Sequence, residues 1–227
     1  MRKRILCIIL SALLFLTSVP LSAAAVSISD FTDVKPSAWY YEAVNYAVIN
    51  GLYSGTSETT FSPETPMTRG MLVKVIGSVA GIPDTYQSSQ VQFSDIKESD
   101  YYAAYAAWAR DNGIVSGVGN NQFAPGNSIT REQIATIFFN YDKKFGKSTA
   151  FSETKYLAFP DTADVSDYAV DALKWATYYD VINGTNTGLT PKGIATRAQV
   201  AQMFFNYSKV SAADRFIYST VFYKTYV

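Results

Sequence analysis

The sequence repeats itself three times, and this periodicity constrains the fold more than any other feature. A Phe-x-Asp segment recurs at intervals of 62 and 66 residues, and a Thr-Arg pair follows with its Arg 38 residues after each Phe. A Pro lies six residues before each Arg, and an apolar residue lies two residues before that Pro. The shared positions are Phe31, Asp33, Phe61, Pro63, Thr68 and Arg69 in the first copy, Phe93, Asp95, Phe123, Pro125, Thr130 and Arg131 in the second, and Phe159, Asp161, Leu189, Pro191, Thr196 and Arg197 in the third. Self-similarity of this kind indicates one supersecondary unit used three times.

Each copy contains two helical patterns separated by a loop. The first pattern covers about residues 39–50 in copy one, and apolar residues recur in it at offsets of three and four. It ends at Gly51, at Gly113 and near Asp180 in the successive copies. The second pattern begins at the Thr-Arg pair. The pairs Ser54-Gly55, Ser116-Gly117 and Asn183-Gly184 lie between the two patterns and predict tight turns with positive φ.

These patterns predict an all-α protein of three helix-loop-helix repeats. A unit of about 55 residues with two short helices buries too little surface to be secure alone, so we expect a pseudo-three-fold symmetric bundle with grooves between repeats. The expected segments are a secretory signal at 1–25, repeats at 26–80, 93–141 and 159–207, linkers at 81–92 and 142–158, and a short C-terminal tail at 208–227.

The signal is expected because three basic residues precede an apolar run from Ile5 to Val19, with Ala23 and Ala25 at the small positions of a cleavage site. An uncleaved membrane anchor is the alternative, but the run of about 15 residues is shorter than the ~20 that span a bilayer. We therefore expect an exported protein with no membrane attachment after the signal is removed.

Composition excludes several classes of function. Histidine is absent, and the single cysteine, Cys7, lies in the expected signal, so His or Cys catalysis and His- or Cys-ligated metals are excluded from the mature chain. No other metal motif is present, and no cofactor is expected. The 19 basic and 19 acidic residues balance, so there is no basic field for nucleic acid.

The Thr-Arg pairs place a cation where a helix does not favour it. Thr68, Thr130 and Thr196 are expected N-caps, and Gln133 and Gln199 complete capping boxes in two copies. An Arg in the first turn opposes the helix dipole, yet all three copies keep it. One explanation is a structural ion pair with Asp33, Asp95 and Asp161 or with a neighbouring repeat. The other is an anion site that combines the guanidinium with free N–H groups of the helix N-terminus.

Aromatic residues open the first helical pattern of each copy and suit a sugar site, because a Tyr or Trp ring offers an apolar face with a polar edge. The candidate ligand-binding residues are therefore Arg69, Arg131, Arg197, Trp39, Tyr40, Tyr102, Tyr168, Asp33, Asp95 and Asp161.

Taken together, the Phe-x-Asp opening, the Trp/Tyr pair, the Gly-bearing turn, the Phe-x-Pro segment and the Thr-Arg helix start resemble the S-layer homology repeat. The resemblance covers residues 31 to about 207. It implies a non-catalytic module of the Gram-positive cell surface that binds anionic, pyruvylated secondary cell-wall polysaccharide in grooves between repeats, with the arginines in contact with the ligand. The chain departs from the family's Thr-Arg-Ala-Glu pattern in all three copies, so we expect the three grooves to differ.

Two alternatives remain. The repeats of a structural or adhesive surface protein would bind other surface proteins or self-assemble. A glycoside hydrolase would use paired carboxylates among Asp161, Asp164, Asp167 and Asp171, although their spacing resembles a solvated helix start.

Overall fold

The computed structural model describes residues 26–88, 90, 92–145 and 149–210. The expected signal at 1–25 and residues 211–227 of the expected tail lie outside this part of the chain. Within it, every regular element is a helix, apart from isolated β-bridges, so the predicted all-α class is confirmed. The main helices are α1 (Tyr41–Ile49), α2 (Arg69–Val79), α3 (Ala103–Asp111), α4 (Arg131–Lys144), α6 (Val170–Tyr178) and α7 (Arg197–Lys209). No helix in the described ranges is both long and apolar enough to span a bilayer.

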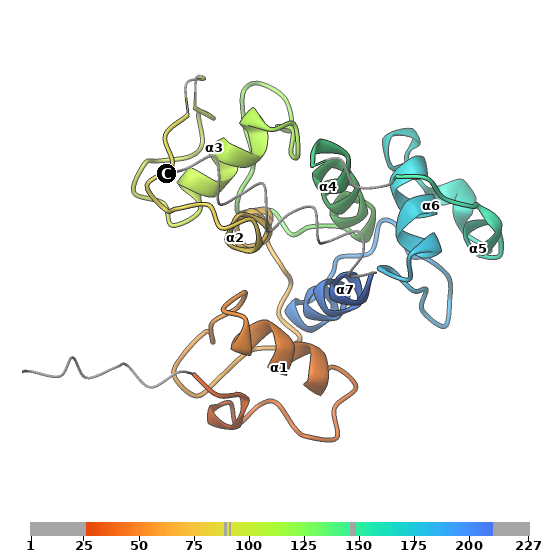
Figure 1. Ribbon diagram of the computed structural model, residues 1–227, viewed down its shortest axis with the longest axis horizontal. Coiled ribbons are helices and arrows are strands. Elements are labelled where there is room, and N and C mark those ends of the chain that lie inside the picture. Colours follow the sequence, from red (N-terminus) through yellow and green to blue (C-terminus); the bar gives the residue numbers. More distant parts are fainter. Residues whose placement is uncertain (1–25, 89, 91, 146–148, 211–227) are drawn as a thin grey trace, which may run out of the picture.

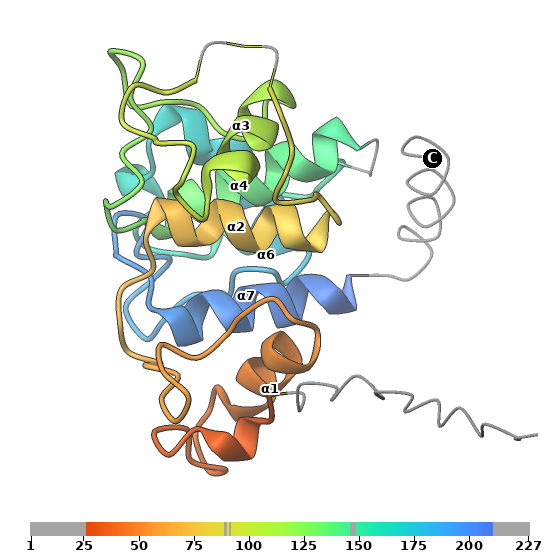
Figure 2. The same ribbon diagram turned by 90° about the vertical axis from the view of Figure 1, so that its left-hand side faces the viewer.

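The second helix of each repeat lies inside the molecule and the first helix lies outside; we call them the inner and outer helices. Figure 1 looks roughly along α2, α4 and α7, which begin at the Thr-Arg pairs and lie in the middle, whereas α1, α3 and α6 lie outside them. The outer helix of each repeat packs on the inner helix of the preceding repeat: α3 on α2, α6 on α4, and α1 on α7. Figure 2 shows α7 passing above α1, which closes the arrangement between the first and last repeats.

Local chemistry sets both ends of these helices. The hydroxyls of Thr68, Thr130 and Thr196 accept from the backbone N–H three residues on, as predicted, and Gln133 and Gln199 complete capping boxes. The outer helices end at residues with positive φ, Gly51 and Gly113, and at Asp180 in the third repeat.

A cycle of backbone hydrogen bonds joins the three repeats at the centre. Met67 donates to Ala195, Ala195 to Ile129, and Ile129 back to Met67, at 2.9, 3.1 and 2.9 Å. All three residues are fully buried and lie at equivalent positions two residues before each Arg. We interpret this cycle as the centre of a pseudo-three-fold arrangement.

The segments expected as linkers contain more helix than the sequence indicated. α4 continues to Lys144, past the expected end of the second repeat at 141, and a short helix, α5 (Thr154–Leu157), lies within the expected linker 142–158. α5 packs against α6, so part of this connection belongs to the third repeat.

The prediction of positive φ at Gly55, Gly117 and Gly184 is wrong. Positive φ occurs instead at the residue before each repeated Pro, namely Ser62, Ala124 and Thr190. The three glycines are required for space. A Cβ at Gly55 or Gly184 would collide with the ring of the Phe that opens the same repeat, and a Cβ at Gly117 would collide with the Gln122 carbonyl oxygen and lie 3.0 Å from the Phe93 ring. The opening Phe is therefore a packing partner of the loop glycine.

Candidate functional site: the clefts between repeats

Each repeated Arg clamps the loop of the following repeat. Arg69 donates from Nε to the carbonyl oxygen of Phe123 at 2.9 Å and from Nη2 to that of Ser116 at 3.0 Å. Arg131 makes the same pair of bonds to Leu189 and Asn183, and Arg197 makes it to Phe61 and Ser54. The three residues are only 6 to 7% exposed, and burial lowers the pKa of each guanidinium below its usual value.

The expected ion pairs between these arginines and the repeated aspartates do not form. Among the described residues, no ion pair joins them to Asp33, Asp95 or Asp161. Each aspartate instead accepts two backbone N–H bonds of 2.7 to 2.8 Å from its own loop, one of them from the residue whose carbonyl the Arg binds. Asp and Arg therefore hold opposite ends of one peptide segment, next to the residue with positive φ.

The expectation of free N–H groups at the helix N-termini is also wrong. At α2, the N–H groups of Arg69 and Gly70 donate to the carbonyls of Asn127 and Pro125, and that of Met71 donates to the Thr68 hydroxyl. The first two N–H groups of α4 and α7 donate to equivalent loop carbonyls of the next repeat. Inter-repeat packing thus uses the donors that an anion would need.

The guanidinium retains unused donors. Each Arg uses Nε and Nη2 for the clamp, and no protein acceptor within the described ranges contacts Nη1. A guanidinium carries five N–H donors in all. Arg69 and Arg131 each line an open cleft.

The Arg69 cleft has a volume of about 520 Å³ and is formed by all three repeats. Its lining includes the loop 114–118, Tyr168 of the third repeat, and the side chains of Gln133, Thr136 and Asn140 along α4. These α4 residues share one face of the helix because their spacing is three and four. The cleft therefore combines a cation, an aromatic side chain and a row of amides and a hydroxyl.

The Arg131 cleft, of about 630 Å³, has the equivalent construction. Trp39 takes the place of Tyr168, and Gln199, Gln202 and Asn206 line it from α7. Asn140 and Asn206 each donate to a loop carbonyl of their own repeat, at 3.3 and 3.4 Å, which fixes the amides at the edge of the cleft.

The predicted aromatic residues divide into two groups. Trp39 and Tyr168 line the clefts and are 61 and 57% exposed. Tyr40 and Tyr102 are partly buried against the core, and the ring of Tyr102 lies so close to Gly70 that a Cβ there would contact it. Tyr101, 60% exposed, is the counterpart of Trp39, since both lie twelve residues before the glycine that follows the outer helix.

The polar residues of α4 and α7 and the cluster around Glu132 were not among the residues expected from the sequence. A signal for the first set was present, because Asn140 and Asn206 both lie nine residues after the repeated Arg. Glu132 occurs in one copy only, so no repeat pattern pointed to it. Among the described residues, no group of three His, Cys, Asp or Glu side chains is arranged to hold a metal ion.

Comparison with known proteins identifies the family. The S-layer homology domain family matches residues 30–70, 92–135 and 158–201, which is more than half of the chain. The chain therefore belongs to the S-layer homology domain family. Each matched range covers most of one of the repeats that build the clefts.

Similar proteins include both enzymes and surface-layer proteins. Exoglucanase XynX of Acetivibrio thermocellus is 29% identical over 195 residues, which cover 85% of this chain and 17% of that protein. The endoglucanase of Bacillus sp. strain KSM-635 is 29% identical over 84% of this chain and 20% of its own length. The surface-layer 125 kDa protein of Lysinibacillus sphaericus is 32% identical over 48% of this chain and 9% of its own length. The chain spans a fifth or less of each of these relatives.

Proposed function

We propose that this chain is a non-catalytic cell-surface module that binds anionic, pyruvylated secondary cell-wall polysaccharide in its inter-repeat clefts. Membership in the S-layer homology family and similarity to surface-layer proteins support a role in attachment to the cell wall. Because the chain matches a fifth or less of the two glucanases, their catalytic activities are not carried over to it.

One observation carries the proposal: a buried guanidinium with unused donors meets an exposed aromatic ring in one open cleft, and this occurs twice with equivalent residues. A carboxylate is the natural partner of the guanidinium donors, since such hydrogen bonds are charge-assisted. The Trp39 or Tyr168 ring offers an apolar face to a pyranose. An acidic sugar satisfies both features together.

Sedimentation with purified cell walls tests this function. Trp39→Ala and Tyr168→Ala are the informative variants, because these side chains are more than half exposed and their loss should leave the core intact. Tyr178→Ala is the matched control, since Tyr178 is also exposed but lines neither cleft. We expect the two cleft variants to lose most of the wall binding and the control to retain it.

A second assay separates wall-glycan binding from protein-protein adhesion. Walls from which the polysaccharide has been chemically stripped should no longer retain the protein. Unchanged retention on stripped walls would support a structural or adhesive role in place of the proposed one.

A further inference from the structure

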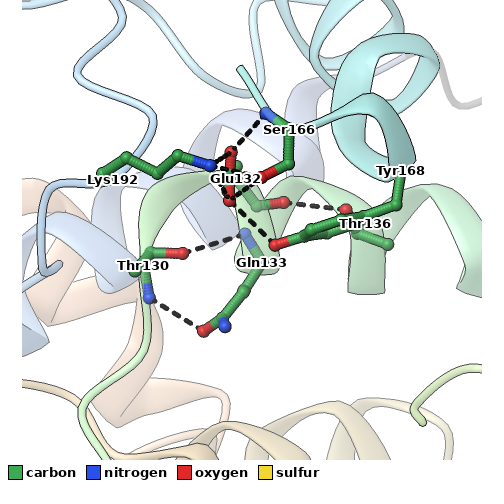
Figure 3. Close-up of polar contacts among 7 residues, drawn as sticks. All are labelled: Thr130, Glu132, Gln133, Thr136, Ser166, Tyr168 and Lys192. Atoms are coloured by element: carbon green, nitrogen blue, oxygen red, sulfur yellow. Dashed lines mark hydrogen bonds and ion pairs between the residues drawn. The ribbon is translucent and has the colours of Figure 1, made fainter. Parts of the chain in front are cut away.

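Glu132 is a buried carboxylate surrounded by donors from the third repeat. It is 3% exposed and directly follows Arg131, where the other repeats have Gly70 and Ala198. Its carboxylate oxygens accept from the backbone N–H and hydroxyl of Ser166 at 3.1 and 3.0 Å, and from Lys192 Nζ at 2.8 and 3.0 Å. Figure 3 shows these groups converging on the carboxylate, together with the hydroxyl of Tyr168.

The protonation states fix the direction of the bond between Tyr168 and Glu132. Burial alone would raise the pKa of Glu132, but its hydrogen bonds to Lys192, Ser166 and Tyr168 outweigh burial and lower it. Glu132 is therefore ionised at neutral pH and can only accept. Burial and the adjacent Glu132 raise the pKa of Tyr168 to about 12, so the phenol is protonated. Tyr168 must donate its proton to Glu132 Oε1 across 2.9 Å.

This assignment leaves the phenol oxygen as an acceptor. A phenol has one O–H donor and free lone pairs, and the donor of Tyr168 is occupied. Tyr168 also lines the Arg69 cleft and is 57% exposed. The nearby Ser166 hydroxyl donates to Glu132, so its proton is not needed by the phenol oxygen and the phenol lone pairs remain for a ligand. The equivalent ring in the Arg131 cleft is Trp39, whose indole N–H is a donor only. Each cleft thus contains an arginine, but the aromatic residue is a hydrogen-bond acceptor in the Arg69 cleft and a donor in the Arg131 cleft.

We propose that Glu132 is a positioning residue that holds Tyr168 as a hydrogen-bond acceptor, so that the Arg69 cleft selects a glycan unit carrying a hydroxyl or amide N–H donor beside its acidic group. The Arg131 cleft has no such acceptor on its aromatic wall and does not make this selection. This inference rests on the proposed binding of wall polysaccharide in the clefts and assigns different sugar preferences to two of them.

Titration calorimetry tests the inference with polysaccharide released from purified walls by peptidoglycan digestion. Tyr168→Phe removes the acceptor but keeps the ring, and it leaves Ser166 and Lys192 on Glu132. We expect it to lower the affinity of one class of sites about five- to tenfold, the effect of one net hydrogen bond. Its melting temperature should fall by several degrees at most, because Ser166 and Lys192 still donate to Glu132. Tyr178→Phe, an exposed phenol outside both clefts, is the control and should bind as the wild type does.

Glu132→Ala tests whether Glu132 acts through Tyr168. Its affinity loss should match that of Tyr168→Phe, and the double variant should lose no more than either single variant. A larger loss in the double variant would show that Glu132 supports binding by another route and would overturn the inference. Unchanged affinity of Tyr168→Phe would also overturn it while leaving the proposed function intact. A wild-type chain that does not bind the polysaccharide would refute both.

Discussion

At the scale of single residues, the repeated arginine holds the repeats together through backbone carbonyls, and not through the ion pair that the sequence suggested. Its Nε and Nη2 atoms hold the neighbouring repeat, and two of the three copies, Arg69 and Arg131, also line a cleft. The helix dipole opposes a cation at this position by a few tenths of a kcal/mol to about 1 kcal/mol. Two charge-assisted hydrogen bonds, the one from Nε to a buried carbonyl, outweigh this cost, which explains why the Arg occurs in every copy.

Removal of an arginine should therefore cost stability as well as binding. Arg131→Ala removes the guanidinium donors from the carbonyl oxygens of Leu189 and Asn183, of which the first keeps only the Thr190 hydroxyl. We expect the free energy of unfolding to fall by about 3 kcal/mol. Urea denaturation measures the change. Lys35→Ala, which removes an exposed cation, should stay within about 0.5 kcal/mol of the wild type. A loss below about 1 kcal/mol for Arg131→Ala would show that the clamp contributes little.

The Glu132 cluster should make stability depend on acid pH. Because the pKa of Glu132 is lowered in the folded state from its usual value of 4.5, its ionised form stabilises the fold fully above about pH 5. That contribution is lost as the pH falls below 4.5 and through the lower folded-state pKa. Denaturation between pH 6 and about pH 3 should show a steeper loss for the wild type than for Glu132→Gln. Parallel curves would contradict the assigned ionisation.

At the scale of elements, the loop before each repeated Pro contains backbone strain that the aspartate and arginine offset. Ala124 has φ of 56°, a conformation that costs a residue with a Cβ about 1 kcal/mol or more. Asp95 accepts the N–H groups of Phe123 and Ala124, and Arg69 donates to the Phe123 carbonyl, so the segment is held at both ends. Because Asp95 of the same repeat and Arg69 of the preceding repeat hold this segment together, a non-glycine residue is tolerated at position 124.

Relief of this strain should stabilise the protein. Ala124→Gly is expected to raise the free energy of unfolding by about 0.5 to 1 kcal/mol, since glycine adopts positive φ without a steric cost. The same substitution in the middle of α3, Ala107→Gly, should instead lower it by about 1 kcal/mol. Thermal and urea denaturation of both variants measure the difference. A loss of stability in Ala124→Gly would contradict the assigned strain.

Much at this scale could be predicted from the sequence. The helices, their Thr caps and the capping boxes at Gln133 and Gln199 depend on neighbouring residues, and the structure confirms them. The partners of Arg69 and the use of the helix N–H groups could not be predicted, because both depend on carbonyls about 50 to 60 residues away. The role of Gly117 was missed for the same reason, since its neighbour Phe93 is distant in the sequence.

At the scale of the whole molecule, the repeats stabilise one another in a closed order. The outer helix α1 of the first repeat packs on α7 of the last, and Arg197 clamps the loop of the first repeat through Phe61 and Ser54. The central cycle of Met67, Ile129 and Ala195 needs all three repeats for its three bonds. Stability should therefore not be a sum over repeats, as it is in an open solenoid.

A truncated chain tests this dependence. Residues 26–145 contain the first two repeats, with all of α4, but lack the helices that pack on α1 and α4. We expect this fragment to show no cooperative urea transition, whereas residues 26–210 should unfold in a single one. Circular dichroism at low protein concentration measures both. A sharp transition of the fragment, with helix content in proportion to its length, would show that the repeats fold independently.

Each of the two described clefts is lined by residues from all three repeats, so the proposed binding depends on the closed arrangement. The most direct test is a calorimetric titration of the chain with wall polysaccharide before and after its acidic substituent is removed by mild acid. The account predicts that removal weakens binding at least about tenfold, as expected when a guanidinium loses a charge-assisted partner. Equal affinity for the acidic and neutral polysaccharides would contradict it.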